Sequence, residues 1–208
     1  LAVCDSLGSY GADGCWQGAF MENVNAGMRG EAPRGNFSES DPLAPCNQVD
    51  DKYRHECYIN HAGWLMQFFR SNTKEAISAC LKAEKYINVC MQSLGLMSTN
   101  PVWQSALLGG RSYENTEVLA QEVCQKFPKE YQEQCIVAGV DNILNFDEFN
   151  TQRAQHFCDI SPANLRDICY AHIGMSLRSQ TTDSNLVQKS CNQFQGNFRQ
   201  QCLKGAGL

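Results

Sequence analysis

The sequence predicts an all-α protein, an array of about six antiparallel helix hairpins that we expect to wind as a right-handed solenoid. Three observations predict this fold class. The chain has twelve cysteines in six pairs, and each pair encloses nine or ten residues. The second cysteines recur at steps of 42, 33, 45, 34 and 33 residues, and apolar residues around them follow helical spacing. A repeat of this kind is the signature of a stacked helical array.

Each cysteine pair is expected to close the corner of one hairpin. A first cysteine near the end of one helix and a second about two turns into the next come face to face in an antiparallel pair. Bridges between adjacent hairpins are the alternative that the spacing leaves open. Closing such a loop stabilises the fold by about 2.5 to 3 kcal/mol in the chain-entropy model. The expected bridges are Cys4–Cys15, Cys46–Cys57, Cys80–Cys90, Cys124–Cys135, Cys158–Cys169 and Cys191–Cys202.

The array is expected to form one domain, residues 1–208, within a longer native chain. Its repeat units lie near residues 1–24, 46–72, 73–97, 114–146, 147–181 and 182–208. Two insertions, residues 25–45 and 98–113, break the period. Glycines and prolines oppose a regular helix over most of the first insertion, so the second unit has little of a first helix. The second insertion is apolar in its middle and is expected to pack on this chain or on a partner.

Helix signals are clearest in the last three units. In the fourth unit, Asn115 or Thr116 can cap a helix that runs to about Phe127. In the fifth unit, Ser161 is expected to be the N-cap, with Pro162 at the first helical position. The predicted unit is therefore a helix, a tight corner, a second helix and a longer turn.

Two residue types recur around the second cysteine. A bulky residue one helical turn before the cysteine lies on the same helix face, and a glycine after it is tolerated where helices cross closely. The bulky residues are Tyr53, Tyr86, Tyr131, Leu165 and Phe198, and the glycines are Gly18, Gly63, Gly95, Gly139, Gly174 and Gly207. The first pair departs from the pattern, with Gly11 in place of the bulky residue.

Composition indicates the compartment and excludes several partners. An even set of twelve cysteines is typical of an oxidised extracytoplasmic protein, whether periplasmic, secreted or at the cell surface. The cysteines lack the close spacing of zinc knuckles. A net charge of −5 without a run of Lys or Arg argues against nucleic acid. No apolar stretch approaches the roughly 20 residues of a membrane span, although association with a membrane complex stays open.

Catalytic motifs are missing from the sequence, so we expect neither an enzyme nor a resident cofactor. The chain has no nucleophile elbow, phosphate-binding loop or zinc-protease helix. His61 and His172 are weak candidates for haem or metal ligands, but an array would place them three units apart. The acidic pairs Asp50–Asp51 and Asp147–Glu148 are better explained as helix-end charges than as general acids or bases.

Aromatic residues give the best candidate for a partner-binding surface. Trp64, Phe68 and Phe69 make both faces of one predicted helix apolar, and Trp103 lies in the second insertion. Exposed parts of these side chains are expected to bind other protein subunits, copies of this chain among them.

A helical hairpin of about 34 residues in tandem resembles the tetratricopeptide class, and one disulfide per hairpin resembles secreted Sel1-like repeat proteins. The resemblance covers the chain from about Cys46 onward and lies in period and bridge count. It implies binding of proteins or peptides on a curved surface, and it transfers no functional residue.

The sequence therefore predicts an extracytoplasmic helical-repeat scaffold or protein-binding subunit of a larger assembly. Two alternatives belong to other classes. A haem or metal protein associated with redox chemistry would be coloured or would contain metal, and a hydrolase with a site built from the two insertions would lose activity when they are deleted.

Overall fold

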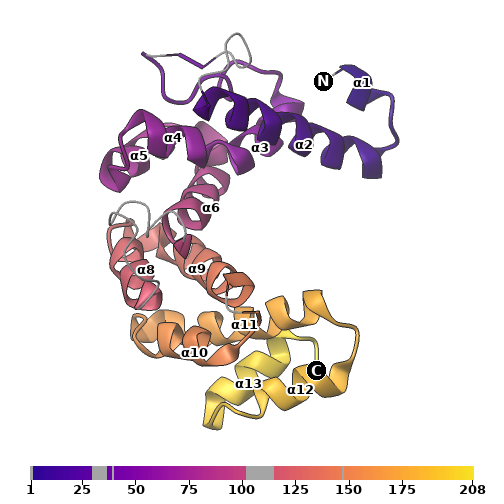
Figure 1. Ribbon diagram of the computed structural model, residues 1–208, viewed down its shortest axis with the longest axis vertical. Helices are drawn as coiled ribbons and strands as arrows, with labels where there is room; N and C mark the ends of the chain where they lie inside the picture. Colours follow the sequence, from indigo (N-terminus) through magenta and orange to yellow (C-terminus); the bar gives the residue numbers. More distant parts are fainter. Residues whose placement is uncertain (1, 30–36, 39, 102–114, 147) are drawn as a thin grey trace. The chain divides into compact units, whose positions relative to one another are not determined.

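A computed structural model of the chain describes residues 2–29, 37–38, 40–101, 115–146 and 148–208. Within these ranges the chain forms helices and turns and no strand (Figure 1). It divides into two compact parts, Leu1–Met97 and Ser98–Leu208. The division falls where the second insertion begins, and most of that insertion, including Trp103, lies outside the described residues. In the part of the chain that is described, no helix is both long and apolar enough to cross a bilayer.

The helices follow the predicted order in both parts. The first part contains α1 (Ala2–Asp5), α2 (Ser9–Met28), α3 (Asp51–Asn60), α4 (Ala62–Phe68), α5 (Thr73–Cys80), the short 3-10 helix η1 (Glu84–Tyr86) and α6 (Ile87–Ser98), which ends at the boundary. The second part contains α8 (Thr116–Cys124), η2 (Lys129–Tyr131), α9 (Gln132–Phe146), α10 (Thr151–Asp159), η3 (Ala163–Leu165), α11 (Arg166–Gln180), α12 (Ser184–Cys191) and α13 (Gly196–Gly205).

All six predicted disulfides are present, and no cysteine is free. Their Cα–Cα distances lie between 5.4 and 5.6 Å. Each bridge joins two consecutive segments, so bridging between adjacent hairpins is excluded. We call the bridged segments hairpins one to six in chain order. As expected, hairpin two has no first helix, because turns occupy residues 42–48.

The corner of a hairpin is fastened by a side chain that the sequence did not point to. The residue three positions before the second cysteine donates a hydrogen bond to the backbone carbonyl three positions after the first cysteine. The three examples are Arg54 Nε to Val49 O (3.1 Å), Gln132 Nε2 to Phe127 O (3.2 Å) and Arg166 Nε to Ser161 O (3.0 Å). Val49, Phe127 and Ser161 lie outside the helices, so each bond satisfies a backbone carbonyl that has no partner in a helix.

Two helix boundaries differ from the prediction. Helix α8 begins after Asn115, which has φ 62° and makes no side-chain capping bond, and it ends at Cys124 rather than near Phe127. Ser161 is not an N-cap, because its buried hydroxyl donates to Phe157 O at 2.8 Å in the preceding turn. Extended backbone at Pro162 (ψ 135°) then delays α11 until after η3.

The recurring glycines have different surroundings. A Cβ on Gly174 of α11 would overlap the backbone carbonyl of Cys202, and a Cβ on Gly205 of α13 would overlap the carbonyl of Ala171. The close crossing expected at Gly174 is therefore present between α11 and α13. Among the described residues, no atom of another segment lies within 4 Å of a Cβ built on Gly18, so the same expectation is wrong there.

Consecutive hairpins meet through aromatic rings at three junctions. The ring one residue after the second cysteine packs on the ring four residues before the second cysteine of the next hairpin. The pairs, with their centroid distances, are Trp16–Tyr53 (5.1 Å), Tyr58–Tyr86 (5.6 Å) and Tyr170–Phe198 (4.4 Å). Such pairs contribute about 0.5 to 1.5 kcal/mol each beyond the area that they bury. At these junctions the bulky residue before the second cysteine therefore joins neighbouring hairpins.

The same three junctions share a second contact. In each case a residue three positions after one second cysteine contacts a backbone carbonyl of the preceding hairpin. That carbonyl belongs to the residue two positions after the preceding hairpin's own second cysteine. The contacts are Asn60 Nδ2 to Gln17 O (3.3 Å), Ser93 Oγ to Ile59 O (2.6 Å) and Gly205 against Ala171 O. Hairpins one and two, two and three, and five and six thus pack in one repeated register, which we call the junction register.

Candidate functional site

Four aromatic side chains lie together in the first part of the chain, and we call Phe37, Trp64, Phe68 and Phe69 the aromatic cluster. The centroid distances are 4.4 Å for Phe37–Trp64, 6.1 Å for Trp64–Phe68 and 4.8 Å for Phe68–Phe69. All four side chains are partly exposed. Three of the four residues predicted from the sequence, Trp64, Phe68 and Phe69, therefore lie together. Part-exposed aromatic groups of this size are typical of protein-binding surfaces.

The end of α4 sets the direction of Phe68 and Phe69. Arg70 and Ser71 both have positive φ, at 48° and 65°. The backbone N–H of Ser71 donates to Met66 O at 2.6 Å and closes the helix end. Neither residue is a glycine, so the left-handed turn carries a conformational cost. The turn ends α4 directly after the two phenylalanines and leaves their rings at its rim.

Phe37, the member that the sequence did not indicate, comes from the first insertion. Its ring lies so close to Gly27 of α2 that a Cβ at that glycine would overlap the ring. The same ring also packs on Trp64, and it stacks on the imidazole of His61 with the ring centroids 6.2 Å apart. The glycine therefore makes room for the insertion to dock beside α4, a relation that only the tertiary fold reveals.

His61 fastens the same insertion. Its Nε2 donates a hydrogen bond to Pro42 O at 2.7 Å, and its side chain is fully buried. Burial lowers the pKa of His61 to about 4, so the ring is neutral at pH 7. Its Nδ1 is buried without a hydrogen-bond partner, as is Nε1 of Trp64. The nitrogen that could face a ligand is thus enclosed, and His61 acts as an anchor for the insertion.

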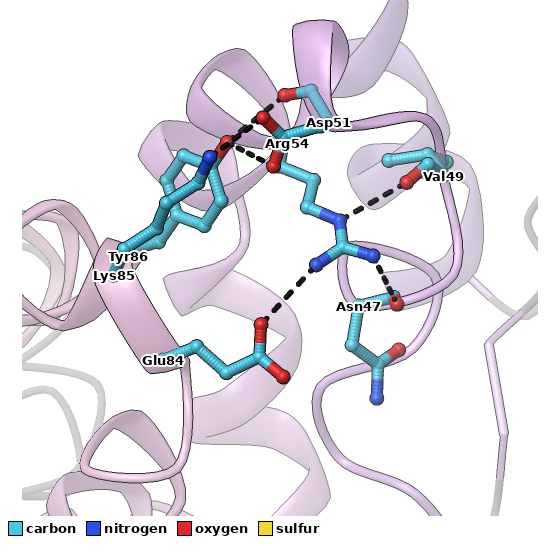
Figure 2. A network of polar contacts seen from close by, with 7 residues as sticks. All are labelled: Asn47, Val49, Asp51, Arg54, Glu84, Lys85 and Tyr86. Atoms are coloured by element: carbon cyan, nitrogen blue, oxygen red, sulfur yellow. Dashed lines mark hydrogen bonds and ion pairs between the residues drawn. The ribbon is translucent and has the colours of Figure 1, made fainter.

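A polar network joins hairpins two and three on the surface (Figure 2). Asp51 accepts hydrogen bonds from Lys85 Nζ at 2.6 Å and from Tyr86 Oη at 2.9 Å. Arg54 Nη1 lies 3.4 Å from Glu84 Oε2 and so reaches the same hairpin. The hydrogen bond from Lys85, followed by that from Tyr86, lowers the pKa of the Asp51 carboxyl. The network binds neighbouring hairpins and leaves no carboxylate unpaired for catalysis.

Hairpins one and two are joined by the same residue types. Asp5 accepts from Tyr53 Oη at 2.5 Å, from Lys52 Nζ at 3.1 Å and from Trp16 Nε1 at 3.1 Å. The hydrogen bond from Tyr53 is the largest cause of a lowered pKa at Asp5. A Lys-Tyr pair before the second cysteine therefore holds an aspartate of the preceding hairpin at both junctions.

His172 lies in a hydrogen-bonded group between α9 and α11. Its Nε2 donates to Asp141 Oδ2 at 3.0 Å, and Ser176 Oγ donates to Asp141 Oδ1 at 2.5 Å. A hydrolytic relay requires the serine hydroxyl to donate to the imidazole. Here both donors point at one carboxylate, so the group fastens two helices and does not activate the serine.

A second polar cluster lies between α8 and α10. Glu117, which is 8% exposed, accepts from His156 Nδ1 at 3.2 Å, and Gln121 Oε1 lies 3.2 Å from Ser161 Oγ. The other carboxylate oxygen of Glu117 and the amide nitrogen of Gln121 are buried without partners. Each unsatisfied buried group costs about 1 to 3 kcal/mol. The hydroxyl of Ser161 is buried and donates to Phe157 O, so the cluster does not present it as a nucleophile.

The remaining candidates do not converge. His61 and His172 contact different residues, and His55 pairs on the surface with Glu56 at 2.9 Å. Among the described residues, no group of three or more His, Cys, Asp or Glu side chains could hold a metal ion. Asp50 precedes α3 and makes no side-chain capping bond. Glu148 has φ 49° and lines an open hollow of about 500 Å³ together with Phe146, Phe149 and Asn150.

Comparison with protein-family models, with curated proteins and with solved structures finds no match. The aromatic cluster is therefore chosen as the candidate site on its geometry alone.

Proposed function

We propose that this chain is an extracytoplasmic helical-repeat scaffold and a protein-binding subunit of a larger assembly. In this proposal the six bridged hairpins stack as a right-handed solenoid and the aromatic cluster is the surface that a partner subunit covers. The observation that carries the proposal is that cluster: four part-exposed rings in contact with one another, held on a disulfide-bridged hairpin.

The junction register supports the stacking. Ring pairs and carbonyl contacts recur at the same distance from the second cysteine at three junctions. A repeated contact between neighbours is how solenoids build a continuous core. The bridges support the compartment, since six disulfides indicate an oxidising environment.

The proposed compartment is tested by mass spectrometry of protein from its source. We expect twelve thiols to react with an alkylating reagent only after reduction, and we expect cross-linked peptides within each cysteine pair. Reactive thiols in the untreated native protein would contradict the compartment.

The proposed binding surface is tested with a photo-reactive phenylalanine analogue at Phe68 in the source cells. We expect one polypeptide to be cross-linked reproducibly and in high yield. The matched control is the same analogue at Met175, which is 54% exposed in hairpin five and outside the cluster. Equal yields from the two positions, or no adduct at Phe68, would remove the cluster as a partner site.

A double Phe68→Ala and Phe69→Ala variant gives the quantitative arm. Truncated hot-spot side chains typically lose about 2 kcal/mol or more of binding free energy, which is roughly a 30-fold weaker complex. The variant should keep its helix content, because both side chains lie at the rim of α4. A partner that binds the variant and the wild-type chain equally well would contradict the proposal.

A further inference from the structure

The polar cluster between α8 and α10 contains a buried negative charge without a permanent counter-charge. The Glu117 side chain is 10% exposed, and among the described residues its carboxylate has one partner within ion-pair distance, the His156 imidazole. An imidazole carries a positive charge only when it is protonated. Buried charges in proteins are paired or coordinate a metal ion. The second carboxylate oxygen of Glu117, Oε2, is buried without a hydrogen-bond partner, so the carboxylate can still accept a cation.

The hydroxyl of Ser161 decides how the amide of Gln121 is oriented. That hydroxyl has a single hydrogen, which it donates to Phe157 O at 2.8 Å. The hydrogen of its 3.2 Å contact with Gln121 must then come from the amide, because the two ends of an amide are assigned from their hydrogen bonds. The amide nitrogen and oxygen of Gln121 therefore exchange places. The oxygen takes the position that is buried without a partner.

The three side chains come from facing surfaces of α8 and α10. Glu117 and Gln121 are four residues apart on α8, so they lie on one face with their Cβ atoms about 5 to 6 Å apart. His156 on α10 contacts the first of them, and Ser161, just after α10, contacts the second. Gln121 is 3% exposed, whereas the His156 side chain is 51% exposed. Two buried oxygen ligands thus lie beside an imidazole that solvent can reach.

The spacing and type of these atoms favour zinc over calcium or magnesium. Two ligand atoms that each lie about 2.0 to 2.1 Å from a tetrahedral zinc ion are roughly 3.3 Å apart. His156 Nδ1 lies 3.2 Å from Glu117 Oε1. Zinc accepts both imidazole nitrogen and carboxylate oxygen, whereas calcium and magnesium bind about six or more oxygen atoms. The set contains one His and one Glu, which agrees with the absence of a group of three or more His, Cys, Asp or Glu among the described residues.

We propose that Glu117, Gln121 and His156 bind one zinc ion between α8 and α10. Glu117 supplies a carboxylate oxygen and the negative charge, Gln121 supplies its amide oxygen, and His156 supplies Nδ1 while its hydrogen stays on Nε2. Water completes the coordination. The ion fastens the first helices of hairpins four and five, which no disulfide joins. The site lies in the second part of the chain and does not depend on the proposed function of the aromatic cluster.

Isothermal titration of zinc into the disulfide-intact chain, first freed of metal by a chelator, tests the proposal. We expect one ion per chain with a dissociation constant below about 50 µM. At a hundredfold excess over that constant, zinc should raise the melting temperature by about 5 to 10 °C, because an ion that binds only the folded chain stabilises it. Weaker binding, or no binding, overturns the proposal.

Glu117→Gln separates ion binding from folding. The substitution keeps the shape of the side chain and removes a buried charge, so without zinc the helix content and melting temperature should not fall. Zinc affinity should fall at least tenfold, and Gln121→Met, which removes the amide oxygen, should weaken binding as well. His55→Gln is the matched control, because His55 Nδ1 also lies on a carboxylate, at 2.9 Å, but on the surface; it should bind zinc like the wild type. If either cluster variant binds zinc as tightly as the wild type, the three-residue site is wrong.

Nitrogen-15 NMR of the histidine side chains gives an arm that needs no variant. Zinc should shift the Nδ1 signal of His156, while Nε2 of the same ring keeps its proton. The signals of His55 and His172 should stay unchanged. A zinc-dependent shift at His55 or His172 in place of His156 would put the ion elsewhere and overturn the assignment.

Discussion

Replacing Gly174 by alanine tests the most crowded contact of the fold. The added Cβ would overlap the carbonyl of Cys202 and would lie 3.0 Å from the backbone nitrogen of Ala206. Both are backbone atoms, so no side chain can turn away and α11 and α13 must move apart. Overpacking of this kind costs about 1 to 3 kcal/mol, and more where the backbone itself must shift.

The helix itself prefers alanine by about 1 kcal/mol, which offsets part of that cost. Because the obstruction is backbone on both sides, we expect Gly174→Ala to lose about 3 kcal/mol net. For a compact part of about a hundred residues, this corresponds to a fall in melting temperature on the order of 10 °C. Urea unfolding followed by circular dichroism measures the loss directly.

Gly18→Ala is the matched control, since Gly18 also follows a second cysteine inside a long helix. No atom of another described segment lies within 4 Å of a Cβ at Gly18, so the added methyl acts through helix propensity and the variant should gain up to about 1 kcal/mol. The measurement uses dilute protein to exclude self-association. If Gly174→Ala is as stable as the wild type, the close crossing of α11 and α13 is wrong.

Three further predictions concern stability. Burial lowers the pKa of His61 from 6.5 to about 4, so as the pH falls the unfolded state takes up a proton before the folded state does. The contribution of neutral His61 to the free energy of unfolding should be complete above about pH 6.5 and should be lost, by on the order of 3 kcal/mol, as the pH falls to about 4. In the His61→Gln variant the urea midpoint should change less with pH between about pH 6.5 and 5, where carboxylates contribute little. If the midpoint changes with pH as steeply as in the wild type, His61 is not buried as described. Arg166→Met removes the corner bond to Ser161 O and should cost about 1 to 2 kcal/mol, whereas Arg166→Lys should recover part of it; equal melting of both variants would refute the corner bond. Removing one bridge with Cys158→Ser and Cys169→Ser should cost about 2.5 to 3 kcal/mol by calorimetry, and an unaltered unfolding transition would show that this disulfide does not stabilise the fold.

The periodic part of the fold is readable from the sequence. Helix spacing and cysteine spacing act locally, and a bridge eleven residues long permits few arrangements. All six pairings and the order of the helices follow from that locality. The missing first helix of hairpin two follows as well, because glycines and prolines act on their own segment.

Contacts between segments were harder to foresee. Trp64 stands out as an exposed aromatic candidate, but the docking of Phe37 depends on space beside Gly27, which no local pattern encodes. Ser161 has the composition of an N-cap, yet its hydroxyl bonds a carbonyl in the preceding turn. Gly18 and Gly174 both follow a second cysteine within a helix, three and five residues after it, and only Gly174 has another helix packed against it among the described residues. Tertiary packing decides each of these cases.

The bridges also determine how this protein can fold and change in evolution. Every disulfide closes a loop of ten or eleven residues, and none links one hairpin to another. The oxidised chain in denaturant therefore keeps six short closed loops, and refolding has to re-form the helices and stack neighbouring hairpins. Because each hairpin contains both cysteines of its bridge, the gain or loss of one hairpin adds or removes a complete pair. The array can therefore change its length by one hairpin without leaving an unpaired cysteine.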